Sequence, residues 1–173
     1  MMMMVLVGCS IFNESEMKEK QDNTVLEVTN VLNDNATVIA DQLNIPWSID
    51  KINDTFYLSE RTGSIVKIEN GEVERQKVEL KKDLATASEA GLLGFVLAPD
   101  FQQSNLAYVY YTYEDQSGQF NRIVTVRQQG DTWQEERLLL DKIPSGAYHH
   151  GGRLEIGPDG KLFATAVDAA QSS

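Results

Sequence analysis

The sequence predicts an all-β chain with the architecture of a β-propeller. From about Ala36 onward, short apolar stretches alternate with turn residues, a pattern typical of consecutive strands. A layout of strand, turn and apolar strand recurs after roughly 50 residues, which is about the length of one four-stranded propeller blade. We therefore expect about two to three blades of a propeller. A sandwich of short strands is the competing architecture, but it does not require this repeat.

Each expected strand has its own local signal. Trp47–Ile52 and Thr55–Ser59 flank the polar turn Asn53-Asp54, and Ser64–Glu69 alternates apolar and polar residues before Asn70-Gly71, a strong turn pair. No segment beyond residue 35 has a convincing helical pattern. The remaining expected strands are Ala36–Ala40, Leu92–Leu97, Leu106–Tyr113, Phe120–Arg127, Thr132–Leu140, Leu154–Ile156 and Leu162–Ala166.

The N-terminal residues predict a secreted, lipid-anchored chain. Leu6-Val7-Gly8-Cys9 resembles a bacterial lipobox, in which a small residue precedes a cysteine that receives lipid. The polar stretch over residues 10–35 buries too little apolar surface to offset the cost of ordering, so we expect a tether. The predicted organisation is a signal-peptide remnant (1–9), a tether (10–35) and a partial propeller domain (36–173) outside the cytoplasm. A chance cysteine in a short apolar N-terminus is the alternative.

The composition narrows the range of partners. The formal net charge of −11 argues against nucleic acid, because phosphates repel an acidic surface. It suits a protein that handles neutral or cationic small molecules. Cys9 is the one cysteine among 173 residues, so an internal disulfide is excluded.

The segment Tyr148–Leu154 is the strongest candidate for chemistry. It holds both histidines of the chain, His149 and His150, followed by Gly151 and Gly152. Histidine is the side chain best suited to exchange a proton near neutral pH, and a carboxylate such as Asp168 can orient it. A metal site formed by these groups is disfavoured, because adjacent side chains diverge on a strand and no third strong ligand is evident.

A family resemblance rests on six motifs in a fixed order. Together they look like the N-terminal half of the soluble quinoprotein glucose/sorbosone dehydrogenase family. That family comprises six-bladed β-propellers that use pyrroloquinoline quinone (PQQ) and calcium to oxidise aldose sugars. The motifs are Pro46–Ile49, Ser59–Gly63, Glu89–Phe95, Pro99–Phe101, Asn121–Val124 and His149–Leu154.

The resemblance implies a role for several residues. His149 falls on the family's catalytic base, which takes the proton of the sugar C1 hydroxyl while hydride passes to the quinone. Asp168 falls on the carboxylate that hydrogen-bonds this base, although Val167 stands where relatives usually have glycine. Glu89 faces the substrate or cofactor edge, and Gly151 and Gly152 let the backbone pass close to the flat quinone.

The resemblance also implies what lies elsewhere. The groups that bind calcium and the cations that hold the quinone carboxylates belong to later blades of the family, so we expect no metal ligand in this chain. The expected partners are a sugar, an external electron acceptor and, through Cys9, a membrane surface. We expect a truncated portion that is inactive alone. A propeller sugar-lactone hydrolase and a non-catalytic surface-binding propeller are the alternative functions.

Several other residues are predicted to be structural. We expect His150 to support its neighbour from the opposite face, and Arg153 to pair with a carboxylate between blades. Glu60 and Arg61 are predicted to form a rim salt bridge of little energetic value. The tyrosines at 108, 110, 111 and 113 are expected to pack within a strand.

Overall fold

The computed structural model describes residues 36–146 and 148–166, and strands dominate them. All of the strands belong to the compact unit that runs from residue 39 to residue 173. In chain order the elements are β1 (Pro46–Ile52), β2 (Thr55–Glu60), β3 (Ser64–Glu69), β4 (Glu72–Glu79), β5 (Leu92–Leu97), α2 (Phe101–Ser104), β6 (Leu106–Asp115), β7 (Gly118–Gln129), β8 (Thr132–Pro144), β9 (Leu154–Ile156) and β10 (Leu162–Ala164).

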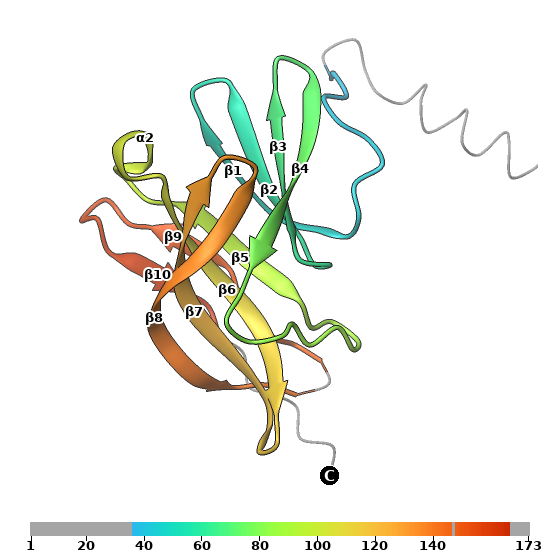
Figure 1. Cartoon of the computed structure of the whole chain (residues 1–173), viewed down its shortest axis with the longest axis vertical. Helices are drawn as coiled ribbons and strands as arrows, with labels where there is room; N and C mark the ends of the chain where they lie inside the picture. The colour runs from blue at the N-terminus through green and yellow to red at the C-terminus, as the bar shows by residue number, and fades with distance from the viewer. Residues whose placement is uncertain (1–35, 147, 167–173) are drawn as a thin grey trace, which may run out of the picture. The chain divides into compact units, whose positions relative to one another are not determined.

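The first four strands form an antiparallel meander (Figure 1). β1 and β2 are joined by the turn Asn53-Asp54, and β3 and β4 by Asn70-Gly71. Asn70 and Gly71 have φ values of 54° and 83°. Positive φ at both central residues matches the twist of a hairpin, which explains why asparagine and glycine stand there.

The next four strands form a second antiparallel meander, which is joined to the first on two sides. On one side β4 and β8 pair in parallel over three residues, Lys77↔Thr132 to Glu79↔Gln134. On the other side Asp50 of β1 accepts a hydrogen bond from the amide of Leu97 at 2.8 Å. β9 and β10 then form a separate hairpin. Two four-stranded blades followed by the first strands of a third confirm the predicted partial propeller.

An aromatic cluster fills the space between the two meanders. The ring of Trp133 lies 5.3 Å from Phe95, 5.9 Å from Phe101 and 6.0 Å from Tyr57, measured between centroids. Trp133 is completely buried, and its indole N–H donates to Gln76 of β4 at 2.8 Å. The same cluster buries Tyr111 and Tyr113 of β6.

The opposite face of the second meander is also covered. Leu93 and Val96 of β5 and Tyr110 of β6 pack there against Leu154 of β9. Because both faces of β5 are buried, its sequence is an apolar run and not an alternation. The tyrosines of β6 therefore divide between two packed faces, which confirms that they are packing residues.

Two expectations about the elements were wrong. Residues 36–40 form no strand; Val38 and Ile39 are 65% and 47% exposed, while Ala40 packs against the outer face of the first meander. α2 was not predicted: it is a single turn that begins where the amides of Gln103 and Ser104 bond to the carbonyl of Asp100.

β4 had no counterpart among the expected strands. Its residues are mostly charged and exposed, and only Gln76 is fully buried. An outer strand of this kind exposes most of its side chains to solvent, so hydrophobic periodicity cannot reveal it. Pairing with β3 and with the start of β8 defines it instead.

The predicted salt bridge between Glu60 and Arg61 is also wrong. Glu60 is 1% exposed and pairs with Arg75 at 3.1 Å, and it accepts further hydrogen bonds from the Asn44 amide and the Ser64 hydroxyl. Burial alone would raise the pKa of Glu60, but these partners stabilise the carboxylate and the net pKa lies below its ordinary value. Arg61, which follows β2, donates instead to the carbonyls of Ser88 and Ala90.

Some predicted features lie outside the described residues: Cys9, the tether over 10–35, Val167 and Asp168. Within residues 36–146 and 148–166, no helix has the length and apolar character needed to cross a membrane.

We predict that Gly94→Ala destabilises the fold by roughly 1–3 kcal/mol through overpacking. A Cβ at this position would lie 2.1 Å from the carbonyl oxygen of Gly152. Urea unfolding measures the change. Gly130→Asn is the control, because that turn is open and asparagine tolerates positive φ. Equal stability of the two variants would contradict the packing described here.

We predict that Glu60→Gln lowers the free energy of unfolding by about 2 kcal/mol at pH 7, since the half-exposed Arg75 loses a buried partner. The folded pKa lies below the unfolded one, so this stabilisation is present above the unfolded pKa and is lost as pH falls through the folded pKa. Unfolding curves from pH 7 to pH 3 should therefore converge. The exposed Glu72→Gln is the control.

Candidate functional site

The candidate site is the loop between β8 and β9, which holds the two histidines in different surroundings. His150 is 3% exposed, whereas His149 is exposed and has a positive φ of 64°. Positive φ is costly for a residue with a side chain and persists only where the surroundings enforce it. The contacts on either side of His149 explain why it does so here.

His150 anchors the loop to the second meander. Its ring Nδ1 lies 2.8 Å from the hydroxyl oxygen of Ser145, and its carbonyl accepts the hydroxyl of Tyr110 at 2.9 Å. Thr112 and Asn121 also lie 3.4 Å from Nδ1, and burial raises the pKa of Tyr110 to about 12. This position agrees with the predicted supporting role of His150.

Glu89 contacts the backbone of His149. It lies in the segment that leads into β5, and its Oε2 accepts a hydrogen bond from the His149 amide at 2.8 Å. A carboxylate bond of this kind is stronger than one between neutral groups. The structure thus brings together two of the residues that the sequence predicted, although they are 60 positions apart.

Of the two glycines after the histidines, Gly152 packs closely against β5 and β6. Gly151 and Gly152 have φ values of 67° and 94°. A Cβ at Gly152 would lie 2.9 Å from the Tyr110 ring and 3.1 Å from Leu93 Cβ. The close approach observed is therefore to the blade core; an approach to a quinone remains a prediction for both glycines.

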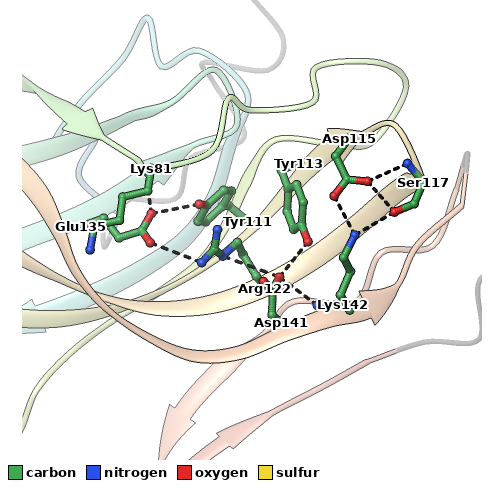
Figure 2. Close-up of polar contacts among 9 residues, drawn as sticks. All are labelled: Lys81, Tyr111, Tyr113, Asp115, Ser117, Arg122, Glu135, Asp141 and Lys142. Atoms are coloured by element: carbon green, nitrogen blue, oxygen red, sulfur yellow. Dashed lines mark hydrogen bonds and ion pairs between the residues drawn. The ribbon is translucent and has the colours of Figure 1, made fainter.

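A polar network fixes the chain just before the loop (Figure 2). Lys142 has a positive φ of 55°, and its ammonium group binds the carboxylate of Asp115 at 2.6 Å and the hydroxyl of Ser117 at 2.9 Å. This contact lowers the pKa of Asp115 and raises that of Lys142. Lys142 also lies 3.8 Å from the centroid of the Phe120 ring.

The same network continues inward along β6, β7 and β8. Tyr113 donates to Asp141 at 2.8 Å, and the buried Arg122 lies between Asp141, at 3.8 Å, and Glu135, at 3.6 Å (Figure 2). Tyr111 donates to Glu135 at 3.0 Å, and burial followed by the charge of Glu135 raises the pKa of Tyr111. The end of β8 is held firmly, so the loop that follows begins from a defined position.

Arg153, which directly precedes β9, links the β9–β10 hairpin to β1 of the first blade. Its guanidinium donates to the carbonyl of Trp47 and lies 5.2 Å from the centroid of the Trp47 indole. The predicted role between blades is correct, but the partner is a carbonyl and an aromatic ring and not a carboxylate.

Hydrophobic and charge patterns did not identify several residues that shape the site. Ser145, Tyr110 and Asn121 hold His150, and none of them was predicted to contact it. Asp168, the predicted partner of His149, lies outside the described residues. In the described part of the chain, no group of three or more His, Cys, Asp or Glu residues is arranged to hold a metal ion.

A groove of about 470 Å³ has Arg153, the last residue of the histidine loop, in its lining. It runs between β1, β5 and the β9–β10 hairpin, with Ile49, Phe95 and Phe163 among its lining residues. Neither His149 nor Glu89 lines it, so we place the candidate chemistry at the loop and not in this groove.

Comparison with known proteins supports a single family. A sequence model of the glucose/sorbosone dehydrogenase family matches residues 43–173. The quinoprotein glucose dehydrogenase B of Acinetobacter calcoaceticus is 31% identical over 152 residues, which cover 78% of this chain and 31% of that protein. The aldose sugar dehydrogenase YliI of Escherichia coli is 26% identical, over 75% of this chain and 37% of that protein. The chain thus spans about a third of the length of these relatives.

Solved structures give the same result. The PQQ-bound aldose sugar dehydrogenase of Streptomyces coelicolor matches with a TM-score of 0.67 and 25% identity, over 79% of this chain and 42% of that one. An oxidoreductase from Thermus thermophilus, described as a glucose dehydrogenase, matches with the same TM-score and 30% identity, over 77% of this chain and 40% of that one.

We predict that Tyr110→Phe loosens the histidine loop and costs about 1 kcal/mol of stability, because the buried carbonyl of His150 loses its 2.9 Å hydrogen bond and keeps the longer one from Asn121, at 3.5 Å. Thermal unfolding measures the stability, and amide exchange over residues 148–152 measures the loosening. Tyr108→Phe, which removes a hydroxyl from the same face of β6, is the control. Unchanged exchange in Tyr110→Phe would contradict the anchoring role of His150.

Proposed function

Because the chain belongs to the glucose/sorbosone dehydrogenase family, we propose that it carries the proton-accepting part of a PQQ-dependent aldose sugar dehydrogenase. One observation supports this most strongly. His149 keeps its imidazole exposed while Glu89 holds its backbone and His150 anchors the loop beneath it. A general base needs this combination of access to substrate and fixed position.

In the proposed reaction His149 accepts the proton of the sugar C1 hydroxyl as the C1–H bond breaks. When bound, the quinone supplies the two-electron acceptor that takes the hydride from C1. The sugar loses one hydride and one proton and becomes the lactone. Asp168 is proposed to orient the imidazole and stabilise its protonated form.

The residues present fit the reacting edge of such a cofactor. The exposed imidazole of His149, whose backbone amide is held by the Glu89 carboxylate, would be open to a sugar bound beside the cofactor. The arginines close to this loop are engaged already: Arg61 by the carbonyls of Ser88 and Ala90, and Arg153 by Trp47. We propose that other cations hold the quinone carboxylates.

Further features of the complete enzyme belong to the same proposal. Calcium would serve the cofactor, an external acceptor would reoxidise it, and lipid on Cys9 would hold the protein at the outer face of the bacterial cell membrane. Glu89, Gly151 and Gly152 would lie at the edge of the cofactor. The lipobox-like Leu6–Cys9 segment supports the anchoring.

We expect His149→Gln to lower kcat at least ~100-fold in the complete gene product supplied with PQQ and Ca²⁺, since general-base catalysis contributes about 10²–10⁴-fold. Reduction of an artificial electron acceptor on addition of an aldose measures the rate. His150→Gln is the comparison. Because His150 is buried, this change should act mainly by lowering the stability of the protein.

Two outcomes would overturn the proposal. Lactone hydrolysis that depends on a metal and not on the quinone would assign the protein to a hydrolase. Full activity in His149→Gln would show that another residue is the base, or that the propeller acts by binding alone.

A further inference from the structure

We propose that Arg61 is a positioning residue of this site, which acts through Glu89 on His149. The consequence for catalysis rests on the function proposed above, whereas the contacts themselves do not. Arg61 directly follows β2 in the first blade, and His149 lies between the second and third. The proposal therefore links the first blade to the base-bearing loop.

The guanidinium of Arg61 holds the segment on both sides of Glu89. Its Nη2 donates to the carbonyl of Ser88, and its Nε and Nη2 donate to the carbonyl of Ala90 at 3.3 and 3.2 Å. A planar fork with several donors can bind two carbonyls at once, which the single ammonium group of a lysine does poorly.

The backbone of Arg61 contacts the same segment. Its carbonyl accepts the amide of Leu92 at 3.0 Å, and a Cβ at Gly91 would lie only 2.3 Å from that oxygen. Gly91 has a φ of 143°, so both the space and the backbone conformation favour glycine. The segment 88–92 is thus fixed against Arg61 by side chain and main chain together.

The hydrogen bond between Glu89 and the His149 amide connects two segments that each contain an unfavourable backbone conformation. Ser88 has a φ of 53° and His149 a φ of 64°, and the carboxylate of Glu89 joins the two segments at 2.8 Å. Such conformations persist only where neighbouring contacts enforce them. Arg61 supplies these contacts for Ser88, and Glu89 supplies them for His149, so loss of the arginine should release both.

The test uses amide NMR of the full chain. In Arg61→Ala, exchange of the His149 amide should accelerate about tenfold, as expected for the loss of the hydrogen bond that it donates to Glu89. Arg61→Lys should restore part of the protection.

Arg127→Ala is the matched control. Arg127 likewise binds a backbone carbonyl, that of Ser104 at the end of α2, but lies in the second blade. Its removal should leave the His149 amide unchanged. If Arg61→Ala fails to fold, Arg61→Lys and Arg61→Gln decide the question, because lysine keeps the length and charge and glutamine keeps a polar donor.

A double-mutant cycle tests whether Arg61 acts through Glu89. Glu89→Ala alone should deprotect the His149 amide, and adding Arg61→Ala should change its exchange by less than about twofold, because the two residues form one unit. Independent, additive effects would overturn the proposal, as would an unchanged His149 amide in Arg61→Ala.

The consequence for catalysis is separate. In the complete gene product, Arg61→Lys should lower kcat about tenfold with little change in KM, since a misplaced base slows the chemical step. If His149→Gln retains activity, the proposed function fails while the amide result still decides the role of Arg61. A kcat unaffected by Arg61→Lys, despite a deprotected His149 amide, would overturn the positioning of the base.

Discussion

The contact between Gly94 and Gly152 is the constraint on which the site depends. The loop before β9 crosses β5 so closely that a Cβ at Gly94 would meet the Gly152 carbonyl at 2.1 Å. Interiors are packed like crystals, so this contact sets the distance between the second blade and the chain after the histidines. Tyr110 lies beside the contact and also binds the carbonyl of His150. The same contacts therefore pack the second blade and place the histidine loop.

From this contact the roles of the two histidines separate. A buried polar side chain must find hydrogen-bond partners, and Ser145, Thr112 and Asn121 surround the ring of His150. With the His150 ring buried, the positive φ of His149 directs that residue toward solvent, and Glu89 stabilises this backbone conformation through its hydrogen bond to the His149 amide. The family supplies the expectation of a base, and the buried neighbour explains how a loop residue can be held well enough to act as one.

Local sequence signals predicted the fold well wherever burial was one-sided or complete. The bounds of β3 and β5 agree with the expected strands, because Asn70-Gly71 and an uninterrupted apolar run mark them. β4 escaped prediction because its side chains are mostly exposed, and residues 36–40 are apolar without being paired. Hydrophobic periodicity indicates which residues are buried. It does not indicate which segments pair as strands through backbone hydrogen bonds.

The sequence by itself determined the strand-rich class, the repeat, the family and the segment that we propose for the chemistry. It did so because each depends on residues that are near neighbours or occur in a fixed order. Only the tertiary structure decided that Glu89 binds the His149 amide and that Glu60 pairs with Arg75. It also decided that Arg61 donates hydrogen bonds to the backbone on either side of Glu89. These partners lie between 15 and 60 positions apart, or on different blades, and their hydrogen bonds follow from how the blades pack. No local pattern encodes that geometry.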